Sequence, residues 1–136
     1  MATETPRTPR KPTHELDWLT DKIIGCAIAV HRVLGPGFLE ATYENALCVE
    51  LEAAGLKFRR QVVYPVLYRG SKVSDYRLDL LVEDVVVVEI KSVDRFDEVF
   101  KAQLLAYLKV TGKHVGLLFN FNVPVLMDGG FKRLVL

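Results

Sequence analysis

The stretch Val85-Val86-Val87-Val88-Glu89-Ile90-Lys91 decides the fold of this 136-residue chain. Its continuous apolar run is typical of a β-strand that is covered on both faces of a sheet. The charged residues Glu89 and Lys91 interrupt that run, and Asp79 stands ten residues before Glu89 on a second apolar run. A buried carboxylate costs several kcal/mol unless a cation or a proton compensates its charge. The sequence therefore predicts a group that neutralises Asp79 and Glu89.

The length of the turn between the two runs decides whether the carboxylates meet. Residues directly opposite each other in an antiparallel pair share a face of the sheet. A three-residue turn, Glu83-Asp84-Val85, places Asp79 directly opposite Glu89. A two-residue turn pairs Asp79 with Val88 and puts the two carboxylates on opposite faces. Both lengths are common in hairpins, and a shared metal site requires the three-residue turn.

Two carboxylates about 5 Å apart at Cα repel each other unless a cation lies between them. Mg²⁺ is the expected cation and Mn²⁺ an alternative, because a hard cation takes oxygen ligands from one or two carboxylates and from substrate phosphates. Lys91 lies on the same face as Glu89, where it would stand beside the attacking water and a negatively charged substrate. The pattern indicates hydrolysis of a phosphodiester. Two strand ends with exposed charges and no function would show the same residues, so the pattern alone leaves both interpretations open.

Composition indicates one globular domain, since half of the residues are hydrophobic and 26% are charged. We expect residues 1–14, rich in Thr, Pro, Arg and Lys, to form a disordered tail before a single domain over residues 15–136. The sequence shows no membrane-length apolar stretch and no signal-peptide region, which predicts a cytoplasmic protein without membrane contact. The formal net charge of +1 argues against tight non-specific DNA binding. Cys26 and Cys48 fall in apolar helical patterns and are expected to be reduced core residues.

Apolar periodicity predicts an α/β fold with a mixed sheet: two helices, a three-stranded antiparallel meander, a helix, a strand and a last short strand. The strand, helix and strand in the second half favour a right-handed parallel crossover. The first two helices are separated by Gly35-Pro36-Gly37. The expected bounds are approximately Leu16–Leu34, Leu39–Ala54, Phe58–Tyr68, Val73–Val82, Val85–Val93, Asp97–Thr111, Val115–Phe121 and Phe131–Leu136.

This order of elements, with Asp79 on the second strand and Glu89-Ile90-Lys91 on the third, resembles the PD-(D/E)xK nuclease superfamily. The resemblance implies a restriction-endonuclease-like core, in which helices flank a central mixed sheet. The stretch from His31 to Tyr43 is similar to the signature of the GxxExxY protein family, a branch of that superfamily, with Gly37, Glu40 and Tyr43 at the naming positions. The further similar stretches are Tyr76–Val82, Gln103–Leu108 and Gly116–Asn122.

The resemblance assigns roles to four residues of the two strands. It implies that Asp79 and Glu89 are the metal-binding carboxylates and that the backbone carbonyl of Ile90 adds a ligand. Lys91 matches the lysine that positions or activates the attacking water. The expected cofactor is therefore Mg²⁺, with Mn²⁺ as a substitute.

The resemblance also implies roles for residues on two helices. Glu40 corresponds to an acidic residue that some superfamily nucleases use as a further metal or water ligand. Gln103 and Tyr107 match the QxxxY element of the RecB-like branch, which orients the site or contacts nucleic acid. Each has a structural alternative: Glu40 suits the first turn of a helix, and Gln103 with Tyr107 can form a polar helix edge. Tyr43 is interpreted as a core aromatic whose hydroxyl is satisfied.

Two functional classes follow. The first is a magnesium-dependent nuclease that hydrolyses phosphodiester bonds in DNA or RNA. The second is a nuclease-like module that binds nucleic acid or a protein partner and turns over slowly or never. A domain of this length has few loops with which to grip a duplex, so we expect substrate binding to depend on a homodimer or a protein partner.

Overall fold

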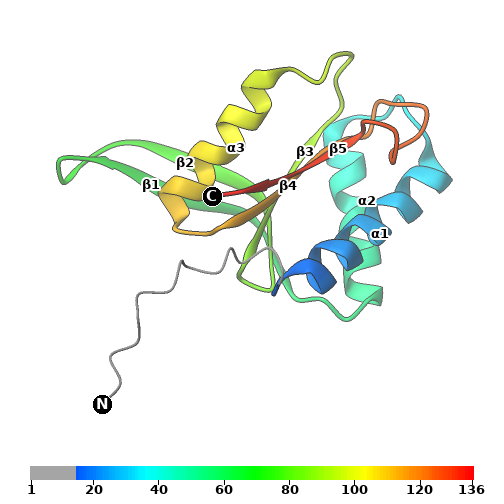
Figure 1. Ribbon diagram of the computed structural model, residues 1–136, viewed down its shortest axis with the longest axis horizontal. Helices are drawn as coiled ribbons and strands as arrows, with labels where there is room; N and C mark the ends of the chain where they lie inside the picture. The colour runs from blue at the N-terminus through cyan, green and yellow to red at the C-terminus, as the bar shows by residue number, and fades with distance from the viewer. Residues whose placement is uncertain (1–14) are drawn as a thin grey trace, which may run out of the picture.

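The computed structural model describes residues 15–136, and the tail expected over residues 1–14 lies outside them. The elements follow the predicted order (Figure 1). Their bounds are α1 Asp17–Leu34, α2 Glu40–Ala53, β1 Phe58–Tyr68, β2 Ser71–Val82, β3 Val86–Lys91, α3 Glu98–Thr111, β4 Val115–Asn120 and β5 Phe131–Val135.

The strands form one mixed sheet in the order β1-β2-β3-β4-β5. Strands β3 and β4 are parallel, and the other neighbours are antiparallel. The predicted three-stranded meander and the parallel pairing across α3 are therefore confirmed. Strands β1 and β5 are the two borders of the sheet, and the outer part of the β1–β2 hairpin extends beyond the other strands as a two-stranded arm (Figure 1).

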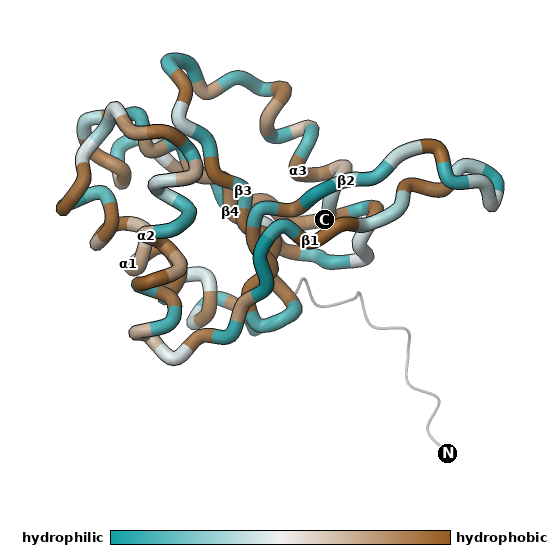
Figure 2. Tube along the Cα trace, turned by 180° about the vertical axis from the view of Figure 1, so that it is seen from behind, coloured by the Kyte–Doolittle hydropathy of each residue, from teal (hydrophilic) through white to brown (hydrophobic). Residues whose placement is uncertain are grey.

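Helices cover both faces of the sheet: α1 and α2 lie on one face and α3 on the other (Figure 1). The hydropathy of the chain follows this arrangement, with β3 and β4 apolar along most of their length (Figure 2). Alternate residues of β3 pack into the two helical layers, Val86 and Val88 against α1 and α2, and Val87 against α3. Each such side chain contributes about 2 kcal/mol by its burial. The continuous apolar run is thus a strand covered on both faces, as the sequence predicts.

Strand β3 ends at Lys91, two residues before the sequence-based limit. The buried side chain of Asn120 replaces a strand partner there: its Oδ1 accepts from the Val93 N–H at 3.1 Å, and its Nδ2 donates to the Val93 carbonyl at 3.0 Å. Asn120 therefore satisfies backbone groups, which is one of the roles that its position in the sequence allows.

The reversal between α1 and α2 is fastened by Tyr43. Its hydroxyl donates to the Gly35 carbonyl at 2.5 Å and accepts from the Phe38 N–H at 3.1 Å. Its ring is buried and stacks on Phe121 with centroids 4.5 Å apart. Gly35 has a φ of 68°, a conformation that glycine adopts without strain. The interpretation of Tyr43 as a core aromatic with a satisfied hydroxyl is confirmed.

Helix α3 approaches β4 closely at Gly116. A Cβ at that position would lie 2.8 Å from Cδ1 of Leu104, so a larger residue would displace the leucine side chain. Leu104 of α3 thus packs directly on β4, and elsewhere along the helix Phe100 contacts Lys91 of β3 and Tyr107 contacts Tyr76 of β2.

Two further observations concern the class of protein. Among residues 15–136, no helix is both long and apolar enough to cross a bilayer. Cys26 and Cys48 are buried free thiols, and burial raises the pKa of both.

Candidate metal and nuclease site

The turn between β2 and β3 has three residues, Glu83 to Val85. The pairs Leu80–Val88, Leu81–Val87 and Val82–Val86 fix this register, and its continuation places Asp79 opposite Glu89. The residue just before β1 helps to hold the turn, because the Glu83 N–H donates to the Lys57 carbonyl at 2.8 Å. The turn length that a shared site requires is therefore present.

Beyond Leu80, hydrogen bonds to the two carboxylates replace the backbone hydrogen bonds between β2 and β3. The Asp79 N–H donates to Oε1 of Glu89 at 3.2 Å, and the Ile90 N–H donates to Oδ2 of Asp79 at 2.8 Å. Each carboxylate thus accepts from the strand that carries the other. Both acids are held at one point between β2 and β3, which is what a shared cation needs.

Glu89 is only 6% exposed, and its burial is the main influence on its pKa. Burial and then the charge of Asp79 raise the pKa of Glu89 to about 9, while the Asp79 N–H and Lys91 act in the opposite direction. Glu89 therefore carries a proton at neutral pH when no cation is bound. A divalent cation would replace that proton and satisfy both acids.

Asp79 lies at an irregular point of β2, where successive inward-facing side chains switch from one helical layer to the other. Leu80 packs against α1 and α2, whereas Leu78, two residues away, packs against α3. Residues two apart on a regular strand share a face. On β1, Gln61 lies between the pairs Arg60–Leu80 and Val62–Leu78, and its φ is 50°. We call this point, Gln61 and Asp79, the face switch.

The face switch carries strain, because a non-glycine residue in the left-handed region costs about 1 kcal/mol or more. The paired positions of β2 and β3 end next to it, at Leu80 and Val88. The carboxylates of Asp79 and Glu89 occupy the place where the ladder stops.

Lys91 lies on the same side of β3 as Glu89. Its Nζ stands over the ring of Phe100 in α3, 4.8 Å from the centroid. A cation held by an aromatic face keeps its position without being neutralised by an acid. The ammonium group is therefore poised beside the carboxylates, and it lowers the pKa of Glu89.

Tyr107 reaches the same region from α3. Its ring packs against Tyr76 of β2 with centroids 4.8 Å apart. Burial raises the pKa of Tyr107, and the charges of Glu89 and Asp79 raise it further. The hydroxyl thus stays protonated beside the two acids. Gln103, one turn earlier on α3, is exposed.

Glu40 lies apart from this cluster. It is the exposed first residue of α2, and residues 15–136 hold no group of three or more His, Cys, Asp or Glu side chains that could bind a metal ion together. The structure does not bring Glu40 together with Asp79 and Glu89, and its position in the first turn of α2 matches the alternative that the sequence left open.

Two carboxylates and one carbonyl fit a hard cation. The Ile90 N–H faces β2, and the carbonyl of the same residue in an extended strand faces the same side. Mg²⁺ in proteins is usually held by one or two carboxylates, with waters and substrate phosphates completing its coordination. The donors that the sequence predicts, Asp79, Glu89 and the Ile90 carbonyl, therefore suit such an ion.

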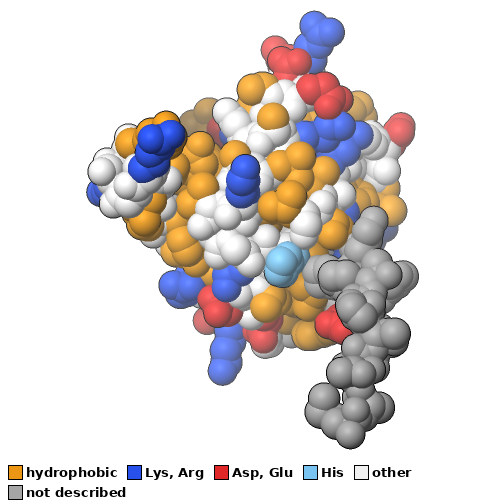
Figure 3. Space-filling model, turned by 60° about the vertical axis from the view of Figure 1, so that its left-hand side comes forward, with side chains coloured by type: hydrophobic (Ala, Val, Ile, Leu, Met, Phe, Trp, Pro, Cys, Tyr) orange, Lys and Arg blue, Asp and Glu red, His pale blue; other side chains and the backbone are white. Residues whose placement is uncertain are grey.

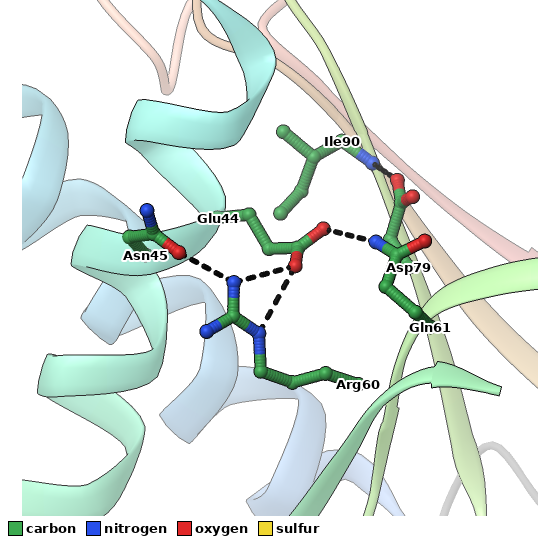
Figure 4. Close-up of polar contacts among 6 residues, drawn as sticks. All are labelled: Glu44, Asn45, Arg60, Gln61, Asp79 and Ile90. Carbon is green, nitrogen blue, oxygen red and sulfur yellow. Dashed lines mark hydrogen bonds and ion pairs between the residues drawn. The ribbon is translucent and has the colours of Figure 1, made fainter.

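Sequence reasoning missed a buried acid in α2. Glu44 is only 7% exposed; its Oε1 accepts from Nε2 of Gln61 at 2.7 Å, and its Oε2 accepts from Nη2 of Arg60 at 2.8 Å (Figure 4). A signal was present: Glu44 occupies the same helical stripe as Leu47 and Leu51. A glutamate among core positions predicts a buried charge with a partner.

The chain matches the PD-(D/E)XK nuclease superfamily over residues 17–134. It belongs to this superfamily, and the restriction-endonuclease-like fold is confirmed. Membership points to a nuclease-type function that binds nucleic acid, and such nucleases typically use divalent metals. No curated protein and no solved structure matches the chain. The narrower resemblance to the GxxExxY family stays a prediction.

Proposed function

We propose that this chain is a divalent-metal-dependent nuclease that hydrolyses phosphodiester bonds in DNA or RNA, with Mg²⁺ as the natural cofactor. The observation that carries the proposal is the meeting of Asp79 and Glu89 between β2 and β3, where each carboxylate accepts from the strand that carries the other. Two acids held this close repel each other, and a cation between them would stabilise both.

Each residue of the site has a separate proposed role. Asp79, Glu89 and the Ile90 carbonyl hold the cation, which when bound lowers the pKa of water and stabilises charge on phosphoryl oxygens. Lys91 donates to the attacking water or to the phosphate, and Phe100 keeps its ammonium group in place. Tyr107 remains a neutral hydrogen-bond donor for the substrate backbone, and Gln103 extends that contact along α3.

Substrate contact depends on individual cations rather than on a dense basic surface. Figure 3 shows a face on which Lys and Arg side chains are separated by hydrophobic and uncharged groups. This agrees with the formal net charge of +1. We therefore expect few phosphate contacts and a shallow dependence of binding on salt concentration.

The test combines metal binding with cleavage. Mg²⁺ and Mn²⁺ are titrated calorimetrically into the wild type, Asp79→Ala and Lys91→Ala. Labelled single- and double-stranded DNA and RNA are then incubated with the same three proteins. We expect cation binding in the wild type and in Lys91→Ala but not in Asp79→Ala. Cleavage should require the cation and should be lost in both variants.

A matched control and a contrary outcome complete the experiment. Glu52→Gln alters an exposed acid of α2 and should leave both binding and cleavage unchanged. Nucleic-acid binding that survives Lys91→Ala, with no cleavage by any form, would support a binding module instead. A wild type that takes up neither cation would refute the proposed function.

A further inference from the structure

We propose that Glu44 is a positioning residue of the carboxylate pair, acting through Gln61 to hold the face switch in the conformation that brings Asp79 to Glu89. This inference rests on the proposed function for its catalytic meaning. Its structural content concerns the metal-free protein and can be tested there.

The contacts of Glu44 show that it acts through β1. Its Oε1 accepts from Gln61 at 2.7 Å, and its Oε2 accepts from Nη2 and Nε of Arg60 at 2.8 and 3.1 Å (Figure 4). Arg60 is held in turn by Asn45, whose Oδ1 accepts from Nη2 at 2.5 Å. Both carboxylate oxygens are therefore committed to two successive residues of one strand.

The second of those two residues, Gln61, is the point where β1 departs from regular geometry. Arg60 still pairs with Leu80, while Gln61 adopts a φ of 50°. A left-handed glutamine within a strand persists only where its surroundings hold it. The hydrogen bond to a buried carboxylate supplies that hold, because Glu44 can only accept and so fixes the amide group of Gln61.

The face switch is coupled to the site by strand pairing. Gln61 lies opposite Asp79 in the β1–β2 register, between two paired positions. Asp79 in turn accepts from the Ile90 N–H and donates to Glu89. The contacts thus run from α2 through β1 and β2 to β3. Loss of the hydrogen bond between Glu44 and Gln61 should therefore weaken the hydrogen bonds between Asp79 and β3.

The first readout is hydrogen exchange of the Asp79 and Ile90 amides, measured by NMR without metal. Loss of one ordinary hydrogen bond corresponds to roughly five- to tenfold faster exchange, which we expect at both amides in Glu44→Ala. Glu44→Gln keeps one acceptor and should give a smaller increase. The Phe121 amide, which donates to the Lys91 carbonyl between β3 and β4, should not change. Glu52→Ala, at an exposed position of α2, is the matched control.

A pair of substitutions at Gln61 separates positioning from general destabilisation. Gln61→Ala removes the hydrogen bond to Glu44 but leaves a non-glycine residue at a positive φ. Its Asp79 and Ile90 amides should therefore exchange as fast as those of Glu44→Ala. Gln61→Gly adopts a positive φ freely, so it should restore exchange close to the wild-type rate even when combined with Glu44→Ala. Failure of this rescue would overturn the proposal. Unchanged rates in Glu44→Ala, or an equal increase at Phe121, would do so too.

The second readout is the affinity for Mn²⁺ of the same variants by calorimetry. Loss of a group that orients a metal ligand typically weakens binding by roughly 10–100-fold, which we expect in Glu44→Ala and Gln61→Ala, with recovery in the double variant Glu44→Ala, Gln61→Gly. A wild type that binds no Mn²⁺ would refute the proposed function, while the exchange rates would still decide the role of Glu44.

Discussion

Protonated Glu89 should make the metal-free protein less stable as the pH rises. The pKa of Glu89 is raised from 4.5 to about 9 by burial and by Asp79, so the folded state binds this proton more tightly than the unfolded state. The resulting stabilisation is fully present below pH 4.5 and is lost as the pH rises through about 9. One pKa unit corresponds to about 1.4 kcal/mol, so the loss from about pH 5 to about pH 8 is on the order of 4 kcal/mol.

Urea unfolding in the presence of EDTA measures this effect. Glu89→Gln provides the reference because its amide resembles the protonated acid and cannot ionise. The free energy of unfolding of the wild type, minus that of Glu89→Gln, should fall as the pH is raised across this range. An equal pH dependence of the two proteins would refute the account of Glu89.

A divalent cation should reverse the trend. Binding replaces the proton, so the wild type should gain stability at alkaline pH in proportion to RT ln(1 + [Mg²⁺]/Kd). Glu89→Gln should gain little, because it has lost one of the two charged ligands.

Three further substitutions test the scaffold that carries the site, each by urea unfolding. Tyr43→Phe removes the hydroxyl that joins the ends of the interhelical turn and should cost about 1–3 kcal/mol; an unchanged stability would contradict this role. Gly116→Ala should cost about 1–3 kcal/mol by overpacking, and the cost should shrink in a Leu104→Ala background. Asn120→Ala leaves buried backbone groups without partners and should cost about 2 kcal/mol or more, whereas a neutral effect would mean that water replaces the amide.

Most of the fold could be predicted from the sequence, because the spacing of apolar residues indicates which faces of the helices and strands are buried. The run from Val85 to Ile90 predicted a strand covered on both faces, and Val86 to Ile90 are all buried. Strand β2 begins two residues earlier than predicted, at Ser71. Its outer end is exposed and is defined by pairing with β1, which leaves no apolar signal.

The turn length could not be read from the sequence. Glu83 and Asp84 both adopt a positive φ, of 51° and 61°, without a glycine to announce it. Contacts with Lys57, 26 residues away, hold the turn: its N–H donates to the Glu83 carboxylate at 2.5 Å. The Val85 N–H also donates to the Val82 carbonyl at 3.1 Å, so a local turn hydrogen bond and the contacts with Lys57 together hold this register.

The helical acids show a second limit of sequence reasoning. The resemblance to a known motif implied that Glu40 is a metal or water ligand, yet Glu40 lies exposed at the start of α2. Glu44, one turn later, is the buried acid of this helix. Arg60 of β1 is the partner of this acid, at 2.8 Å between its Nη2 and Oε2 of Glu44. A pairing between an acid of a helix and a base of a strand depends on how the two elements pack, and apolar spacing does not encode it.

Strand β1 is one border of the sheet, and Pro65 lies in its outer half. Proline has no N–H, so a strand from another molecule would find no donor at that position. Aggregation by strand addition is therefore disfavoured at this position of the sheet.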